Sequence, residues 1–262
     1  MRERRPLPSA GTAARAAALL PIVLTCASAQ WIHYPTPGIP RTPDGKPNLS
    51  GPAPKAPDGK PDLSGIWVPP NGKYLPNLAV DGIDVPFQPW ARDLYRKRQE
   101  SNGMGRPSER CLTHGVTDFD ALASPRRIIQ TPGMIAILFE AYNHYRQIFL
   151  DGRPLPPATQ PAFLGYSVGK WQGDTLVVDT TGFNDRGWLD DGGHPQTEAL
   201  HVTERYRRQN FGHIDLSVTI DDAKAYTKPW TAKLSGLDFL ADEELIESIC
   251  ENEKDVVHMV GK

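Results

Sequence analysis

The residues best able to do chemistry gather between positions 184 and 204. They are His194, Glu198, His201 and Glu204, preceded by Asn184, Asp185, Asp190 and Asp191. Imidazole and carboxylate groups together can exchange protons with a substrate or bind a metal ion. Residues three apart on a strand face opposite sides, so His201 and Glu204 are not expected to bind one ion together. We predict a metal-free site without a cofactor. In it His201 or His194 is the acid or base, and Glu198, Glu204 or Asp185 orients it.

A purely structural role is the main alternative for Glu204. Three arginines, Arg205, Arg207 and Arg208, follow it closely. A polar strand residue commonly pairs with Arg or Tyr across a sheet. His194 lies instead in the loop Gly192-Gly193-His194-Pro195, where it is free to close over the mouth of a barrel. A metal site here stays open as the less favoured alternative.

A second polar row alternates along the segment that begins at Tyr142. Such a row lines a ligand cavity or faces solvent, and the sequence leaves both options open. Aromatic side chains elsewhere, including Tyr145 and Trp230, offer apolar surface for a bound molecule. We predict ligand contacts from six residues, which are Tyr142, His144, Arg146, Trp188, Tyr226 and Glu251.

Several common catalytic motifs are missing from the chain. It has no Gly-x-Ser-x-Gly, no phosphate-binding glycine-rich loop, no His-Glu-x-x-His and no Cys-x-x-Cys. These absences disfavour an elbow-serine hydrolase, nucleotide chemistry, zincin proteolysis and thiol redox chemistry.

The N-terminus is typical of an export signal. Three arginines near the start precede an apolar run over residues 13–24, and Ala27-Ser28-Ala29 supplies the small residues that a signal peptidase requires. We predict cleavage after Ala29 and a periplasmic or secreted location. A charge and a proline interrupt the run, so a stable membrane anchor is not expected. Lipidation at Cys26 is a weaker alternative, because Val23-Leu24-Thr25 precedes it.

Two cysteines, Cys111 and Cys250, remain after cleavage, and in an oxidising compartment we expect them to pair. The full chain has 29 basic and 31 acidic residues, and the signal removes four arginines and one glutamate, which leaves a net charge of −5. No strongly basic stretch contains interleaved aromatics. A nucleic-acid partner is therefore not expected. We expect a small-molecule ligand, and the sequence does not indicate the oligomeric state.

The chain divides into the signal (1–29), a proline- and glycine-rich arm (30–61) and one domain (62–262). The arm contains a duplication, because residues 43–51 recur almost unchanged as residues 57–65. Only the second copy continues into a strand-like segment, Ile66-Trp67-Val68, so only that copy is expected to enter the core. In both copies Pro-Asp-Gly-Lys has the chemistry of a turn.

The domain reads as mainly β. A helix is expected within Asp84–Glu100, and short alternating segments separated by turn residues predict the strands. These are 66–68, 127–130, 134–139, 144–150, 166–171, 175–180, 200–208, 213–220, 230–234 and 245–250. Gln172-Gly173-Asp174 is a strong hairpin signal. Hairpin-length links favour a single antiparallel meander closed into a barrel.

Two resemblances extend this interpretation. Leu63-Ser64-Gly65-Ile66-Trp67 resembles the Gly-x-Trp opening of lipocalin-like (calycin) barrels, which implies a tryptophan that plugs the narrow end. Longer stretches, with residues 173–178, 182–185, 200–205 and 225–230 among them, resemble a family of secreted bacterial proteins of unknown function. The second resemblance covers most of residues 60–255 and implies no catalytic role.

We therefore expect an exported, lipocalin-like barrel with one short helix and an extended arm. It binds a small, partly apolar molecule in a pocket lined by His, carboxylate and aromatic residues, where metal-free acid–base catalysis is an option. A carrier without turnover, and an envelope-associated interaction domain, are the alternatives.

Overall fold

The computed structural model describes residues 35–157 and 160–250. The predicted signal peptide and Glu251 lie outside these residues. Within the described residues, ten strands form one sheet. It closes because β10 pairs with both β1 and β8, so that nine strands make a barrel and β9 lies outside it. The strands are β1 Gly65–Val68, β2 Arg126–Gln130, β3 Met134–Phe139, β4 His144–Phe149, β5 Tyr166–Gln172, β6 Thr175–Thr181, β7 His201–Arg208, β8 His213–Asp221, β9 Trp230–Lys233 and β10 Leu237–Phe239.

The predicted mainly β barrel is confirmed, with two differences in detail. β4 and β5 pair in parallel, whereas the other pairings are antiparallel. A hairpin turn cannot join parallel neighbours, and here a long, proline-containing connection between Phe149 and Tyr166 returns the chain to the starting end. The predicted strand at residues 245–250 is wrong, because that segment has no strand structure. The closing strand is β10, whose three residues are too short to show alternation.

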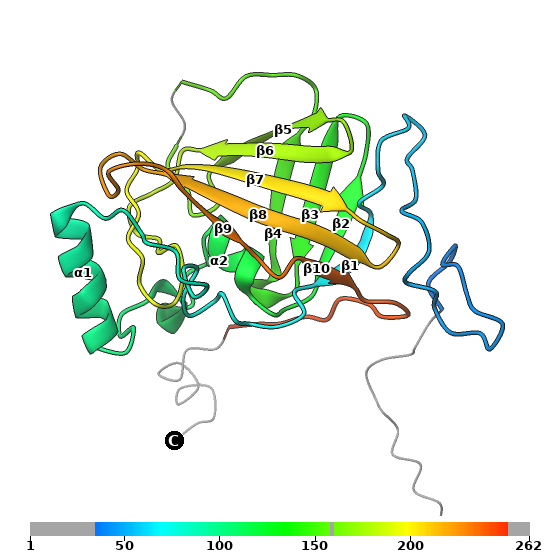
Figure 1. Ribbon diagram of the computed structural model, residues 1–262, viewed down its shortest axis with the longest axis horizontal. Coiled ribbons are helices and arrows are strands. Elements are labelled where there is room, and N and C mark those ends of the chain that lie inside the picture. The colour runs from blue at the N-terminus through cyan, green and yellow to red at the C-terminus, as the bar shows by residue number, and fades with distance from the viewer. Residues whose placement is uncertain (1–34, 158–159, 251–262) are drawn as a thin grey trace, which may run out of the picture. The chain divides into compact units, whose positions relative to one another are not determined.

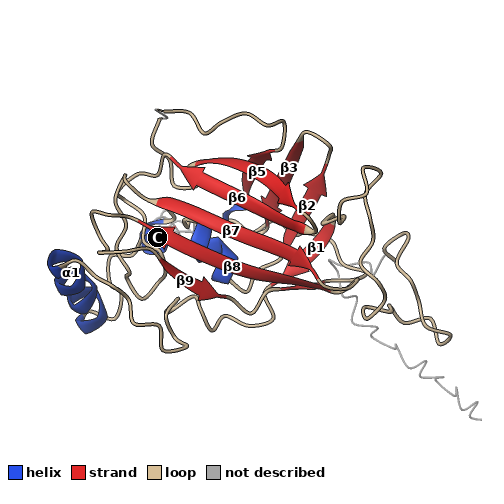
Figure 2. Cartoon of the chain, turned by 45° about the horizontal axis from the view of Figure 1, so that its top comes forward, coloured by secondary structure: helices blue, strands red, loops and turns tan. Residues whose placement is uncertain are grey.

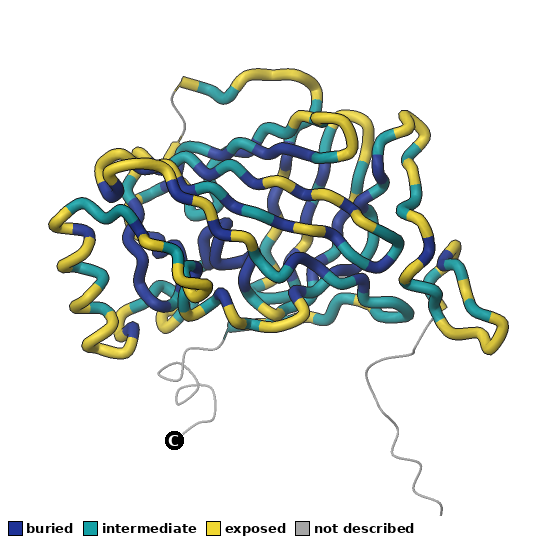
Figure 3. Tube along the Cα trace, viewed as in Figure 1, coloured by how far each residue is buried: buried dark blue, intermediate teal, exposed yellow. Residues whose placement is uncertain are grey.

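Two walls of the barrel can be followed in the figures. Figure 2 shows β5 to β8 lying side by side, with β2 and β3 in the opposite wall. Buried and exposed residues alternate along β7 and β8 (Figure 3), as expected for a sheet with one face in the core. This alternation directs Val202, Glu204, Tyr206 and Arg208 of β7 into the barrel.

Of the two α-helices in the described residues, one lies outside the barrel and the other packs against its inner face. α1 (Pro89–Glu100) lies within the range predicted for a helix, and it begins at Pro89 because proline fits the first turn and the residue before it is extended. It lies outside the barrel (Figure 1). α2 (Val116–Ala121) was not predicted, and all six of its residues are buried. Its Phe119 ring stacks on Phe139 of β3 with centroids 4.1 Å apart, which places α2 against the inner face of the wall. Two 3₁₀ turns, η1 (Pro107–Arg110) and η2 (Ala141–Asn143), flank this region.

Trp67 fills the space beside the closing strand. Its side chain is fully buried, its Nε1 donates to the carbonyl of Leu63 at 2.9 Å, and its ring meets Phe239 edge-on at 5.1 Å. Gly65 adopts φ 132°, and a Cβ there would overlap the Phe239 ring. Glycine is thus required at position 65, because it lets the Phe239 ring, which packs on Trp67, approach the backbone closely.

Both copies of the duplication form the same turn. The Thr42 amide donates to Lys46 O and the Ala56 amide to Lys60 O, each at 2.8 Å. The expectation that only the second copy reaches the core is wrong. The first copy pairs with the β7–β8 turn, where the Gly212 amide donates to Leu49 O at 2.8 Å, and the Leu49 side chain packs against the core.

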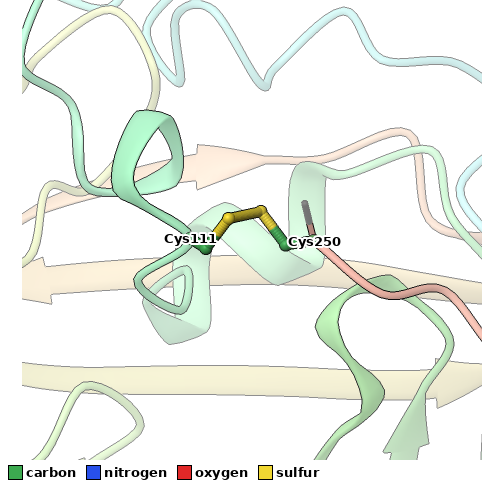
Figure 4. The surroundings of a disulfide bond; sticks show 2 residues. All are labelled: Cys111 and Cys250. Atoms are coloured by element: carbon green, nitrogen blue, oxygen red, sulfur yellow. A yellow bond between two sulfur atoms is a disulfide. The ribbon is translucent and has the colours of Figure 1, made fainter. Parts of the chain in front are cut away.

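A disulfide joins Cys111 to Cys250 with their Cα atoms 5.5 Å apart (Figure 4), which confirms the predicted pairing. It links the residue after η1 to the segment that follows β10. Among the described residues, no helix is both long and apolar enough to cross a membrane.

Candidate functional site

The barrel interior contains a buried ion pair between facing walls. Arg146 of β4 donates from Nη1 to Glu204 Oε1 at 2.8 Å and from Nη2 to Glu204 Oε2 at 2.5 Å. The same guanidinium donates to Thr180 Oγ1 at 2.9 Å and to Ser167 Oγ at 3.1 Å. The Tyr206 hydroxyl donates to Glu204 at 2.6 Å. Every polar atom of the pair is therefore engaged, which agrees with the structural alternative for Glu204.

α2 extends this network with Asp120. Its Oδ1 lies 3.2 Å from the Tyr206 hydroxyl and 3.6 Å from Arg126 Nη1. Burial, and then the negative charge of Glu204, raise the pKa of Asp120 well above its usual range. Burial likewise raises the pKa of the Tyr206 hydroxyl. These groups and apolar side chains fill this part of the barrel.

His194 forms a buried pair with Asp190. The two lie four residues apart, and His194 Nδ1 is 2.6 Å from Asp190 Oδ2. Asp190 is saturated, because Oδ2 also accepts the Leu78 amide at 2.8 Å, and Oδ1 accepts the amides of Gly193 at 2.9 Å and His194 at 3.1 Å. A carboxylate so placed requires a proton on Nδ1, which leaves Nε2 of the neutral ring as an acceptor. No described residue hydrogen-bonds to that Nε2.

The loop that carries His194 is held between α1 and residues 74–79. Arg98 donates to Gly193 O at 3.0 Å, and Gln99 donates to Gly192 O. A Cβ on Gly192 would overlap the Pro76 carbonyl oxygen. Gly193 adopts φ 100°, and a Cβ there would lie 2.7 Å from Arg98 Cβ. Both glycines are therefore needed to bring His194 to this position.

Aromatic rings surround the imidazole. Tyr95 of α1 stacks on it with ring centroids 4.2 Å apart, and Phe87 lies parallel at 5.5 Å. Trp230 is tilted at 5.6 Å, and the Tyr226 hydroxyl fixes the next residue of the loop by donating to Pro195 O at 2.7 Å. Burial, and then the charge of Asp190, raise the pKa of Tyr95.

His194 lines a pocket of about 260 Å³ that is open to solvent. Its walls combine apolar groups, two aromatic rings and one charge of each sign. They are formed by Asn77, Ala79, Ile83, Asp84, Val85, Phe87, Arg92, Tyr95 and His194. The arrangement can seat a small, partly apolar molecule with a polar group against His194, since a pocket of this kind supplies apolar contact and a few orienting groups.

A second histidine cluster lies where α2 begins. His114 Nδ1 contacts Asp118 Oδ2, and ligand-type atoms of His114, Asp118 and Asp191 all lie within 4.8 Å of one another. Burial raises the pKa of Asp118 to about 7. Burial lowers the pKa of His114, but the hydrogen bond and charge of Asp118 outweigh it, so the net shift is upward. Burial also raises the pKa of Asp191.

Tyr142 belongs to this second cluster and not to a barrel cavity. Its backbone adopts φ 62°, which turns the chain before β4, and its ring meets His114 edge-on at 4.9 Å. Burial, and then the charges of Asp191 and Asp118, raise its pKa. A non-glycine residue held in this conformation is uncommon and often marks a functional position.

The remaining predicted catalytic residues do not converge with His194. His201 Nε2 lies 2.9 Å from Asp179 on the outer face of the wall. Glu198 is exposed and paired with Lys224, and Asp185 is exposed in a turn. Glu198 and Glu204 lie in different environments, because β7 begins only at His201 and Glu198 precedes it.

The other predicted ligand contacts are spread over three places. His144 lines an open hollow of about 440 Å³ with Tyr145, Phe163 and Arg186. Trp188 is buried, and the Arg98 guanidinium lies over it, with Arg98 Cζ 4.0 Å from the centroid of the Trp188 ring. Burial lowers the pKa of Arg98 to about 10. Tyr226 contacts the His194 loop through its hydroxyl group, which donates to Pro195 O.

Sequence reasoning missed His114 and Asp118 and gave Asp190 no partner. Both pairs share a signal, since each histidine lies four residues from an aspartate. That spacing brings side chains together on one helical turn. The four-residue spacing could not be interpreted for residues 114–118, because α2 was not predicted. In the 190–194 loop the contact depends on a non-helical turn, which the spacing does not predict.

A comparison with known proteins finds no matching family model, no matching curated protein and no matching solved structure.

Proposed function

We propose that the protein binds a small, partly apolar molecule in the His194 pocket and exchanges a proton with it through His194. The observation that carries the proposal is the His194–Asp190 pair at the wall of an aromatic pocket. Asp190 orients the ring and stabilises the imidazolium that forms when Nε2 takes up a proton, as the carboxylate does in a Ser-His-Asp triad. Tyr95 and Phe87 supply apolar surface, and Arg92 and Asp84 are placed to orient polar groups at the rim.

The proposal includes export of the mature chain. It is supported by the N-terminal pattern and by the disulfide, since disulfides form and persist in oxidising compartments. Treating cells that express the protein with an export inhibitor tests this part. Accumulation of a precursor longer by about 29 residues is the expected result, and unchanged processing would contradict it.

The binding test is a ligand-observed NMR screen with small aromatic and alicyclic alcohols and carboxylic acids. Compounds that bind the wild-type protein should lose at least about tenfold in affinity for His194→Gln. The matched control is His201→Gln, since His201 also pairs with an aspartate but on the outer face. Binding at this pocket would be refuted if the compounds bound H194Q as tightly as the wild type. It would also be refuted if H194Q and H201Q lost the same affinity.

A tautomer measurement separates proton exchange from simple binding. ¹⁵N NMR of the wild-type protein should show neutral His194 protonated at Nδ1, because Asp190 can only accept there. Asp190→Asn can present an amide donor, so the proton should move to Nε2 and remove the acceptor from the pocket. A compound that binds H194Q weakly but binds D190N normally supports a carrier without turnover.

A further inference from the structure

We infer that His114, Asp118 and Asp191 form a binding site for one divalent transition-metal ion, of the Zn²⁺ or Mn²⁺ type. This site is separate from the His194 pocket, and no ion is present in the structure. One ring nitrogen and one oxygen from each carboxylate lie within 4.8 Å of one another, close enough for one ion to collect them with a small inward movement.

The strongest indication is an unsatisfied carboxylate oxygen. Asp118 is 5 % exposed, and its Oδ2 faces His114. Its Oδ1 is buried and has no hydrogen-bond partner among the described residues. Buried polar atoms are nearly always paired, so an unpaired oxygen on a carboxyl group that lies close to Asp191 calls for a cation or another ligand.

Charge and chemistry favour a divalent ion over a structural ion pair. Besides His114, Asp191 lies near Arg106, whose Nε is 3.9 Å from Asp191 Oδ1 and whose Nη1 is 3.6 Å from Glu109. Arg106 is therefore shared and does not reach Asp118. A nitrogen ligand combined with two carboxylates suits Zn²⁺ or Mn²⁺ better than Mg²⁺ or Ca²⁺, which prefer oxygen ligands alone.

The surrounding structure holds the ligands in place. His114 and Asp118 are four residues apart across the start of α2, which is entirely buried. The disulfide at Cys111 fixes the chain three residues before His114, and Asp191 is next to the anchored Asp190. Three protein ligands leave positions for water, and Asp191, whose side chain is 27 % exposed, provides the access.

The test is isothermal titration of the full-length, disulfide-bonded protein with ZnCl₂ and MnCl₂ after treatment with EDTA, with MgCl₂ and CaCl₂ for comparison. We expect one ion per chain and at least about a tenfold loss of affinity in both Asp118→Asn and Asp191→Asn. If D118N does not fold, D191N still decides, because Asp191 is partly exposed.

The matched control is Asp238→Asn. His213 also lies near two aspartates, at 2.7 Å from Asp238 and 3.5 Å from Asp215, but on the protein surface. D238N should bind the ions as the wild type does. No binding of Zn²⁺ or Mn²⁺ at millimolar concentration, binding unchanged in D191N, or binding lost in D238N would overturn the inference. An anomalous-scattering peak between His114 and Asp191 in crystals grown with ZnCl₂ would support it directly.

Discussion

Replacing Arg146 by methionine tests the interpretation of the barrel interior. Arg146 is 4 % exposed and Glu204 fully buried, and the arginine makes two of the hydrogen bonds to that carboxylate. The substitution leaves Glu204 with the Tyr206 hydroxyl at 2.6 Å. Removing one partner of a buried ion pair costs about 3–5 kcal/mol, because an uncompensated charge stays behind.

The pH dependence of this loss follows from elementary titration. The unpaired carboxylate can escape its burial penalty by taking up a proton. A glutamic acid in water titrates near pH 4.3, so holding one protonated costs about 3.7 kcal/mol at pH 7 and about 1 kcal/mol at pH 5. Arg146→Met should therefore be about 4 kcal/mol less stable than the wild type at pH 7, and it should regain roughly 2–3 kcal/mol of that difference by pH 5.

Urea unfolding followed by tryptophan fluorescence measures these free energies. The double variant Arg146→Met/Glu204→Leu removes both charges, so it should be closer to wild type than Arg146→Met alone. Arg153→Met is the control, since Arg153 pairs with Asp151 on the surface, and it should leave stability near the wild-type value. A loss of unfolding free energy below about 1 kcal/mol in R146M would refute the reasoning. So would a loss in the double variant that equals the sum of the losses in R146M and E204L.

Three further predictions concern the second histidine cluster, the disulfide and the His194 loop. In EDTA-treated protein, burial raises the pKa of Asp118 to about 7. Folding therefore retains a proton that the unfolded chain releases near pH 4, and the wild type should lose up to about 4 kcal/mol relative to Asp118→Asn between about pH 4 and pH 7 in urea titrations. A pH-independent difference would contradict this. Replacing Cys111 and Cys250 by serine opens a loop with a sequence separation of 139 residues, and calorimetry should show a loss of about 2–5 kcal/mol; unchanged stability would argue against the bridge in solution. Gly192→Ala places a methyl group against a carbonyl oxygen and should cost about 1–3 kcal/mol. Gly133→Ala meets open space and is the control, so equal stability of the two variants would speak against the packing described.

Much of the barrel could be predicted because strand signals are local. The alternation of Ile214, Leu216, Val218 and Ile220 predicts which face of β8 is buried, and the structure buries all four. Gln172-Gly173-Asp174 likewise predicts the β5–β6 hairpin, and in the structure Gln172 pairs with Thr175 across the turn. The pairing of Cys111 with Cys250 follows from there being no other partner once Cys26 is removed.

Parts of the fold depended on contacts that no local pattern encodes. α2 is six residues long, too short for a helical period, and its burial inside the barrel stabilises it. The parallel pairing of β4 with β5 depends on the path of a long loop. β10 is three residues long, and it is recognisable only as the strand that closes the ring.

The candidate site shows the same division between sequence and tertiary structure. The residue types alone marked His194 as a group able to exchange protons, because imidazole chemistry belongs to the side chain itself. The residue types could not show that the partner of His194 is Asp190 and not Glu198 or Asp185. That pairing needs a turn whose two glycines fit between α1 and Pro76. Nor could the residue types unite His114 and Asp118 with Asp191, which is distant in sequence. Side-chain chemistry is a property of each residue, whereas convergence at a site depends on how separate segments pack in the folded chain.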